Sequence, residues 1–383
     1  MVRQAWVGLL GLLLAATFAS AQSRDPVRCP STRDVWLSAM DGETDFNMGG
    51  APTLKLKLWQ EFALVDFDVS GVEGHTIRKA TLYIHPAGGH RLGLNGGSDL
   101  RWLTVSTVTH NWVEGESRKY SVDRRGKGAT FNESSYGAQD WGWKGSRVWD
   151  VILGNGNSLR FDGLLNPTDD GWLKMEIDPD LVASLVAGTT HGLVLMDGST
   201  AEFVNSLVHS RESGHGPYLE VELESPDTSP PAIPSEIQLQ TYSAGATETK
   251  GAAWLSMRLS PGTFGVDLSI NGTQLDRWQI PPPTPPGGKL SFPILDLEPG
   301  SDLRLEVTAI DSAGNRSLPA RATGTASPAI GHSTLPVLPA IPYVEDHSGV
   351  DQLDFWALPA VSKLDQVTGR LIDEPTPPEL EYR

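Results

Sequence analysis

Side chains of the kinds used in nucleophilic catalysis lie close together in "VHSRESGHGPYLEVEL", residues 208–223. Ser210, Glu212 and His215 are the residue types of a serine triad. Such a triad needs its nucleophile on a sharp turn beside an oxyanion hole, and its members usually come from distant positions in the chain. No Gly-x-Ser-x-Gly motif surrounds Ser210, and a glycine-containing loop separates it from His215. The pattern therefore favours a structural role over a catalytic one.

The structural alternative is a clasp formed by Ser210, Arg211 and Glu212. We expect Arg211 or Glu212 to be partly buried and to pair with the backbone or with a charge from the first strand of the domain. Because a buried charge must be paired, such a clasp would lock the terminal strands of the domain together.

Histidines and carboxylates are the candidate metal ligands of the sequence. Zinc ligands have a two- to four-residue spacing, which is lacking in His85, His90, His209 and His215, and Cys29 is the only cysteine. We therefore expect these histidines to be scattered and solvated. The turn "DGETDFN", residues 41–47, is more suggestive because it offers several carboxylate oxygens. Such oxygens suit Ca²⁺. A structural calcium ion is the only cofactor that the sequence suggests, with these ligands: Asp41, Glu43 and Asp45.

Glycoside hydrolysis needs two carboxylates that face each other across a cleft. The chain has 47 Asp and Glu residues, so pairs are easy to imagine and mean little. Nothing in the sequence selects two of the acidic residues in the predicted loops, which include Glu114, Glu116, Asp140, Asp169 and Asp170. We therefore expect no enzymatic activity and no catalytic residue.

The 12 tryptophans carry more information about function. Flat aromatic rings stack on the apolar faces of sugars, and neighbouring polar groups fix the orientation. In "AQDWGWKG" two tryptophans are two residues apart, so both would face the same side of an extended chain. The predicted ligand-binding residues are Trp141, Trp143, Asp140, Lys144 and Trp112. The alternative is that these rings fill the core beneath a long loop. We place Trp36, Trp59 and Trp172, which lie in predicted strands, in the core.

Short alternating segments separated by glycine-containing turns dominate the region that must position these residues. They predict strands at residues 54–59, 62–69, 79–86, 100–108, 172–177, 191–197 and 217–223. "DPDLVASLVAG" predicts one short helix, because it begins with Asp-Pro and ends with Gly188. The Trp-rich segment 111–157 lacks alternation and predicts a long, ordered excursion between strands. The fold class is therefore all-β, with a jelly-roll-like sandwich first.

Two proline-rich stretches, residues 225–236 and 327–343, read as semi-rigid linkers. They divide the chain into a first domain of residues 31–224, a second of residues 233–325, and a linker with a tail at residues 326–383. The second domain is all-β and suits an immunoglobulin-like sandwich.

The N-terminus predicts a secretory signal peptide, residues 1–21, with an apolar run at residues 5–18 and the small residues "ASA" before the cleavage site. The run is shorter than the ~20 residues that span a bilayer, so we favour export over a membrane anchor. One cysteine in an exported chain suggests a bacterial protein, secreted or at the cell surface. The net charge of −17 opposes nucleic acids and anionic membranes.

The first domain is similar to the DNRLRE (disaggregatase-related) family of exported β-sandwich modules, over residues 34–224. The similarity lies in the order of "DVWL", "FALVDFDVSGVEGHTIRKATLYI", "HNWVEG", "IDPDLVASLVAG", "HGLVL", "HSRES" and "PYLEVEL". It departs in the long Trp-rich insertion and at Val65, where a basic residue is common. The resemblance implies a module that sits beside a catalytic domain, and some members are treated as carbohydrate-binding modules.

The second domain resembles a fibronectin type III domain in "LEPGSDLRLEVTAIDSAGNRS", residues 297–317, although Leu303 replaces the corner tyrosine. Together the residues predict an exported, non-catalytic accessory protein that binds polysaccharide at a cell surface or beside a degradative enzyme. The alternatives are a structural or adhesive spacer, the N-terminal part of a larger carbohydrate-active enzyme, and an enzyme of another type.

Overall fold

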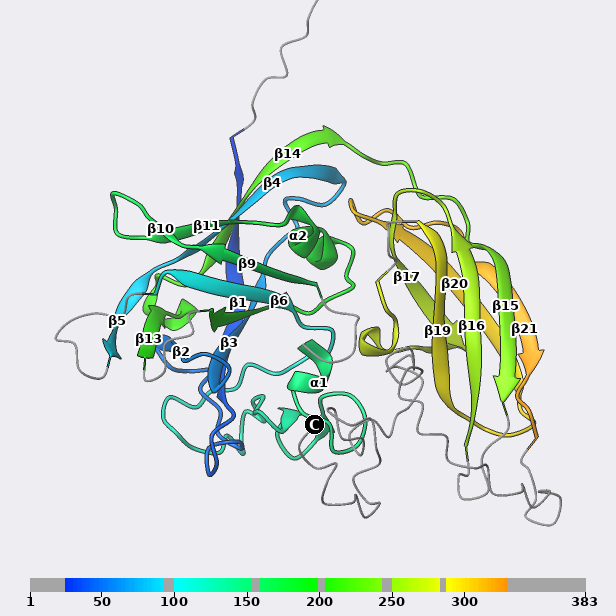
Figure 1. The fold of residues 1–383 in the computed structure, drawn as a ribbon, viewed down its shortest axis with the longest axis horizontal. Helices are drawn as coiled ribbons and strands as arrows, with labels where there is room; N and C mark the ends of the chain where they lie inside the picture. Colours follow the sequence, from blue (N-terminus) through cyan, green and yellow to red (C-terminus); the bar gives the residue numbers. More distant parts are fainter. Residues whose placement is uncertain are drawn as a thin grey trace, which may run out of the picture.

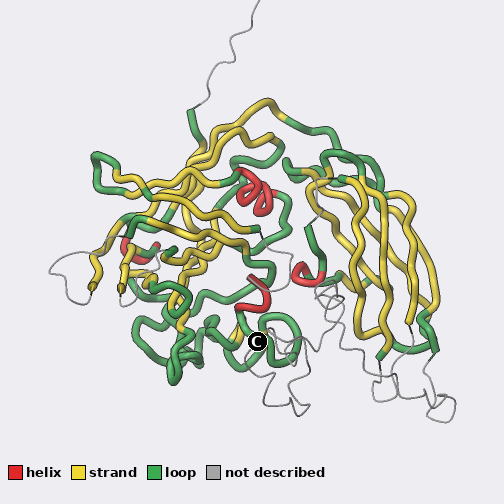
Figure 2. Tube along the Cα trace, in the orientation of Figure 1, coloured by secondary structure: helices red, strands yellow, loops and turns green. Residues whose placement is uncertain are grey.

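The computed structural model describes residues 25–91, 100–152, 159–198, 204–242, 250–282 and 287–328. The predicted signal peptide and the tail from residue 329 lie outside these residues. The described chain forms two antiparallel β-sandwiches side by side, with few and short helices (Figures 1 and 2), so the all-β prediction is confirmed. No helix in these ranges is long and apolar enough to cross a membrane.

The first sandwich is built on a nine-stranded sheet. Its strands, in spatial order, are β10 (Asn166–Pro167), β11 (Leu173–Ile177), β4 (His75–Ile84), β14 (Tyr218–Pro226), β1 (Val27–Ser38), β3 (Glu61–Phe67), β12 (Leu193–Asp197), β6 (Trp102–Thr107) and β9 (Arg160–Leu164). The long strand β1 pairs with β14 near its start and with β3 near its end, and the register shifts between Ser31 and Arg33. The sheet therefore turns at β1, and its edge strand β9 contacts β11, the strand next to the opposite edge.

Smaller elements complete this sandwich. A three-stranded sheet joins β2 (Thr53–Leu56), β13 (Val204–His209) and β5 (Pro86–Arg91), and a hairpin joins β7 (Glu133–Ser135) and β8 (Gln139–Asp140). The helices are α1 (Trp149–Ile152), α2 (Pro179–Val186) and the 3₁₀ turn η1 (Arg211–Ser213). The predicted helix is confirmed as α2, where the Asp178 carboxylate caps the N-terminus by accepting from the Asp180 N–H.

Strands β1, β3 and β12 are buried on both faces. On one face Trp36, Ala63 and Leu195 join the core between the two halves of the sheet. On the other face Leu37, Phe62 and Val194 join a second core that also contains apolar residues of the Trp-rich excursion. The excursion is therefore a layer of the fold that covers the outer face of these strands.

The second sandwich packs a three-stranded sheet against a four-stranded one around its own core. The first sheet contains β15 (Ser235–Tyr242), β16 (Gly251–Leu259) and β19 (Gly288–Leu297). The second contains β18 (Thr273–Gln274), β17 (Thr263–Ile270), β20 (Asp302–Asp311) and β21 (Ala320–Thr325), and a 3₁₀ turn, η2 (Arg277–Gln279), follows β18. Leu303 is buried at the position of the missing tyrosine, so packing replaces the corner hydrogen bond there.

The two sandwiches are joined by hydrogen bonds near the first proline-rich stretch. The Gly74 N–H donates to the Ala313 carbonyl at 2.9 Å, and the Asp227 N–H donates to the Gly74 carbonyl at 2.8 Å. The Asn315 side-chain amide donates to the Asp227 carbonyl at 2.9 Å. The turn after β20, which carries the Asp-x-x-Gly-Asn pattern, thus contacts the first sandwich.

Candidate functional site

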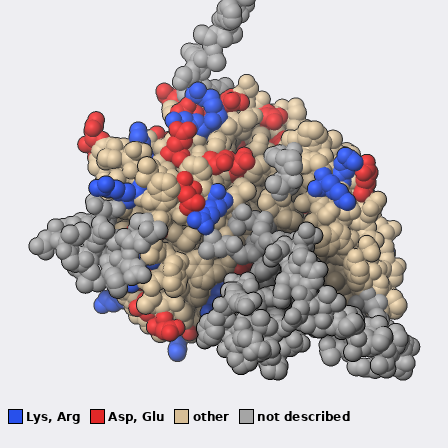
Figure 3. Space-filling model, viewed as in Figure 1, with Lys and Arg blue, Asp and Glu red and all other residues tan. Residues whose placement is uncertain are grey.

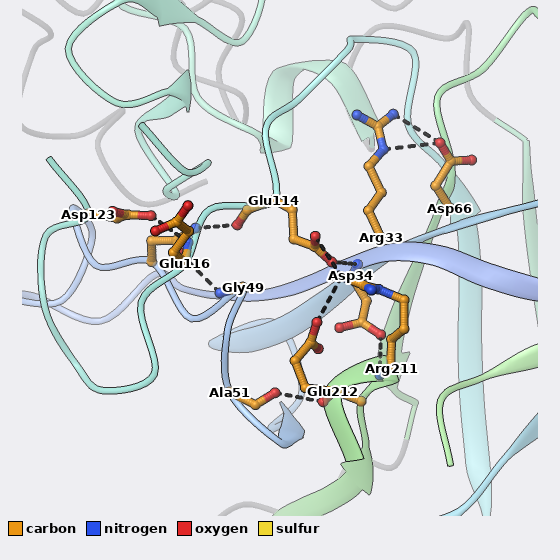
Figure 4. Close-up of polar contacts among 12 residues, drawn as sticks. Arg33, Asp34, Gly49, Ala51, Asp66, Glu114, Glu116, Asp123, Arg211 and Glu212 are labelled. Atoms are coloured by element: carbon orange, nitrogen blue, oxygen red, sulfur yellow. Dashed lines mark hydrogen bonds and ion pairs between the residues drawn. The ribbon is translucent and has the colours of Figure 1, made fainter. Parts of the chain in front are cut away.

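The segment that follows β13 meets strand β1 in a cluster of charged side chains, which we call the carboxylate clasp: Asp34, Glu114, Arg211 and Glu212 (Figure 4). Asp34 lies in β1, and its Oδ2 accepts from the Arg211 N–H at 2.8 Å. The Asp34 N–H in turn donates to Glu114 Oε1 at 2.7 Å. The Arg211 guanidinium lies 2.9 Å from a carboxylate oxygen of Glu114 and 2.8 Å from one of Glu212. The clasp thus connects β1, the Trp-rich excursion and the β13–β14 connection.

The clasp holds more negative than positive charge. Three carboxylates surround one guanidinium, and the Asp34 side chain is only 1% exposed. Burial is the main cause that raises the pKa of Asp34 to about 8, and the charges of Glu212 and Glu114 add to it. The Arg211 N–H opposes this rise but does not cancel it.

Ser210, the third predicted member of the clasp, anchors the chain and is not placed for catalysis. Its side chain is fully buried, and its hydroxyl donates to the Ala51 carbonyl at 2.6 Å. The Ser210 N–H donates to the Pro52 carbonyl at 3.1 Å. The buried hydroxyl is held by a backbone carbonyl, so Ser210 does not have the geometry of a triad nucleophile.

Trp112 was predicted to bind a ligand, and this prediction is wrong. The ring is 2% exposed, its Nε1–H donates to the His191 carbonyl at 2.7 Å, and the Arg33 guanidinium lies 4.2 Å above its centre. Arg33 also pairs with Asp66 at 3.0 Å. Burial and the nearby Arg33 lower the pKa of His191 to about 4. Trp112 therefore packs the excursion against the sheet.

The predicted platform of Trp141 and Trp143 is also wrong as a pair. Trp141 is fully buried, with its Nε1–H donating to the Thr130 carbonyl at 2.9 Å, whereas Trp143 is 45% exposed. The chain turns here instead of extending, since the Ser146 N–H donates to the Trp143 carbonyl at 3.0 Å. The rings consequently point to different surroundings, and the one in the core covers the outer face of β3.

Trp143 contacts the second sandwich. Its ring centre lies 5.4 Å from that of Trp278. Lys144 is exposed next to it, while Asp140 accepts the Gly145 N–H at 3.0 Å. The predicted residues Trp143, Asp140 and Lys144 thus remain near the surface, at the boundary between the sandwiches.

The predicted calcium turn does not gather its carboxylates. Glu43 accepts from the Ser38 hydroxyl at 2.7 Å, and Asp45 accepts from the Asn132 amide at 2.8 Å. Within the described ranges, a single group of three or more candidate ligands has atoms close enough to share an ion, and it excludes this turn. The local hydrogen bonds draw Glu43 and Asp45 towards different partners, so calcium at Asp41, Glu43 and Asp45 is not supported.

Aromatic side chains that were not predicted as a site line the solvent side of the nine-stranded sheet. We call Tyr83, Trp172 and Tyr218 the ring platform. Tyr83 of β4 lies opposite Tyr218 of β14, and the two rings stack with centres 4.6 Å apart. The Trp172 ring lies 4.9 Å from that of Tyr218, and the Arg28 guanidinium lies 3.7 Å above Tyr218. Tyr218 is 7% exposed, so Tyr83 and Trp172 are the rings that solvent reaches.

Three histidines border the ring platform. We call His85, His209 and His215 the histidine trio, because their ring centres are 5.0–5.5 Å apart. Burial and the other two imidazoles lower the pKa of His209. The prediction of scattered histidines is therefore wrong for these three, while the side chain of His90 lies outside the described part.

Two of the three tryptophans that were predicted in the core are not buried there. Trp59 is 60% exposed and Trp172 is half-buried, whereas Trp36 lies in the core as predicted.

The sequence contained a signal for the ring platform. Ala80, Leu82 and Ile84 of β4 point to the core, as do Leu219 and Val221 of β14. The alternation therefore places Tyr83 and Tyr218 on the solvent side. Charged residues of both signs mix over this part of the first sandwich (Figure 3), where β4, β11 and β14 lie in Figure 1.

Comparison with known proteins identifies no family. No protein-family model matches the chain, and no curated protein matches it either. Solved structures show weak likeness. A glycoside hydrolase domain, Endo-D from Streptococcus pneumoniae R6, has a TM-score of 0.21 and 11% identity over 78% of this chain. A beta-1,2-glucanase from Parabacteroides distasonis has a TM-score of 0.22 and 11% identity over 74% of it.

This chain covers 37% of the first of those chains and 35% of the second. The PKD domain of an M14-like peptidase from Thermoplasmatales archaeon SCGC AB-540-F20 is matched over 99% of its length and 27% of this chain, with 14% identity and a TM-score of 0.19. Likeness at these scores carries no argument about function, so the function must be argued from the side chains.

Proposed function

We propose that this protein is an exported, non-catalytic accessory protein that binds a neutral polysaccharide through the ring platform. The observation that carries the proposal is the pair of solvent-reached rings, Tyr83 in β4 and Trp172 just before β11. Flat rings complement the apolar faces of sugars, and polar groups beside them fix the orientation of the ligand. The resemblance of the first domain to DNRLRE modules agrees with this role.

Polar groups suited to sugar hydroxyls lie around the rings. Burial is the main cause that raises the pKa of the Tyr83 phenol, and a hydrogen bond with the Glu220 carboxylate adds to it. The Thr168 hydroxyl is the main cause that lowers the pKa of Asp170, and the nearby His85 side chain makes a small contribution. Imidazole and carboxylate groups offer both donors and acceptors. The net charge of −17 favours a neutral glycan over a polyuronate.

A structural spacer is the second candidate, because two of the tryptophans expected on the surface are in the core. Trp141 and Trp112 are 0% and 2% exposed. The stacked Tyr83–Tyr218 pair would then serve only to stabilise β4 against β14, as cross-strand aromatic pairs do.

Glycan-array binding of the purified protein separates the two candidates, followed by titration of any bound glycan with variants. Trp172→Ala should weaken binding about fivefold, since a stacking contact is worth roughly 1 kcal/mol. Tyr83→Ala should act in the same direction. Trp143→Ala is the matched control, because it removes an exposed tryptophan elsewhere and should leave binding unchanged.

Two results would contradict the proposal. Loss of binding in Trp143→Ala but not in Trp172→Ala would move the site to the boundary between the sandwiches. Absence of binding to every neutral glycan would favour the spacer. Circular dichroism of each variant checks that the β-structure is intact.

A further inference from the structure

We infer that the carboxylate clasp binds a divalent cation of the calcium class through Asp34, Glu114 and Glu212. One oxygen from each of these carboxylates lies within 4.8 Å of the other two. Oxygen ligands at 2.3–2.6 Å around one Ca²⁺ ion lie at such separations from one another. This site is independent of the ring platform and of the turn at residues 41–47.

A buried carboxylate oxygen is the second observation. Asp34 is 1% exposed, and its Oδ2 is satisfied by the Arg211 N–H. Its Oδ1 is buried and has no hydrogen-bond donor among the described residues. Figure 4 shows the Asp34 carboxylate between Arg211 and the carboxylate of Glu212. A buried polar atom without a partner costs free energy, and a cation beside Oδ1 would remove that cost.

The neighbouring positive charges do not balance the clasp. Arg211 contacts Glu114 and Glu212, but its contact with Asp34 is through the backbone N–H. Arg33, next to Asp34 in β1, is paired with Asp66 at 3.0 Å. Three carboxylates therefore lie beside one guanidinium that pairs with two of them, and this excess negative charge attracts a cation. The alternative is a proton retained on Asp34, for which burial raises the pKa to about 8.

The ligand set favours Ca²⁺ over Mg²⁺. Calcium accepts irregular shells of 6–8 oxygens, whereas magnesium requires a near-ideal octahedron at 2.0–2.1 Å. The three carboxylates come from a strand, a loop and a 3₁₀ turn, an irregular arrangement. The Arg211 guanidinium bridges Glu114 and Glu212 and must leave them when the ion binds. Its side chain is 41% exposed, so it would move into solvent, and water would complete the shell from that side. A bound ion would strengthen the connection of β1 with the excursion and with β14.

Calorimetric titration of the EDTA-treated full chain with CaCl₂ and, separately, MgCl₂ tests the site. We expect one Ca²⁺ per chain, weaker Mg²⁺ binding, and a melting temperature that rises with Ca²⁺ concentration, because the ion binds the folded state. Asp34→Asn should weaken Ca²⁺ binding at least about tenfold. Asparagine keeps an acceptor for the Arg211 N–H and removes the charge, so this variant should fold. Glu212→Gln should act in the same way.

Asp41→Asn is the matched control, because it removes an acidic residue from the turn at residues 41–47 and should leave the calcium response unchanged. A calcium response that survives in Asp34→Asn and Glu212→Gln would overturn the site. So would a native protein without any calcium response.

Discussion

The two tryptophans of "WGW" show how strongly one turn decides the role of a residue. Trp141 packs against the outer face of β3 with no exposed surface, while Trp143 is 45% exposed beside the second sandwich. The spacing of the two tryptophans would be the same in an extended strand and in a turn, so the spacing alone does not tell whether the rings face the same side. Here the chain bends over residues 141–143, and a tight turn follows in which Gly145 has a φ of +81°.

Replacing each tryptophan by alanine should separate the two roles. Trp141→Ala leaves a cavity in the core and should lower the free energy of unfolding of the first sandwich by about 3–5 kcal/mol. Trp143→Ala should change it by less than about 1 kcal/mol. Urea unfolding followed by circular dichroism measures both. Equal losses in the two variants would contradict the burial of Trp141.

At the scale of the element, the strands were largely predictable, whereas their second covering layer was only one of two alternatives for the Trp-rich segment. The sequence indicates half-buried strands by alternation, and β4 and β14 follow that pattern. Strands β3 and β12 contain continuous apolar runs, "FALV" and "LVLM", and are buried on both faces. Such runs are typical of strands covered on two sides. They indicate that some segment must cover the outer face, but not that the Trp-rich excursion does so.

The carboxylate clasp and the histidine trio, in contrast to the strands, could not be predicted in full from the sequence. One part was predictable: the charged residues of the β13–β14 connection were expected to pair with a charge from the first strand, because such a pair would lock the terminal strands together. The ligand cluster of Asp34, Glu114 and Glu212 joins residues far apart in the sequence, and β4 and the β13–β14 connection bring His85, His209 and His215 together in the same way. No spacing rule reveals contacts made by strand pairing.

Gly192, at the entry to β12, tests the packing of β12 on β3. Its φ is +115°, and an added Cβ would lie 2.8 Å from the Val65 carbonyl oxygen. Gly192→Ala should therefore destabilise the first sandwich by roughly 1–3 kcal/mol or more. Gly137→Ala is the control, since φ is +66° there and nothing lies within 4 Å of the added carbon. If thermal melts show a smaller loss of stability for Gly192→Ala than for Gly137→Ala, this register of β12 on β3 would be wrong.

At the scale of the whole molecule, the proline-rich segment between the sandwiches is part of their interface. Residues 225–236 were predicted to be a semi-rigid linker. Asp227 in this segment donates its N–H to Gly74, and its carbonyl accepts from the Asn315 side chain. Trp278 of the second sandwich packs against the second core of the first sandwich, the core that contains apolar residues of the Trp-rich excursion. The Asp-x-x-Gly-Asn turn, which suggested a fibronectin type III-like domain, thus has a second role in docking.

Removing both contacts should loosen the arrangement of the two sandwiches without unfolding either one. The double variant Asn315→Ala/Trp278→Ala loses the hydrogen bond to Asp227 and the ring contact with Trp143. Small-angle X-ray scattering should then give a larger radius of gyration, and calorimetry should resolve two melting transitions, because interfaces of this kind within one chain are readily broken. Trp59→Ala is the control, because this ring is 60% exposed and contributes to neither core. A scattering profile identical to that of the unmodified protein would mean that other contacts fix the arrangement, and the docking role of Asn315 and Trp278 would be wrong.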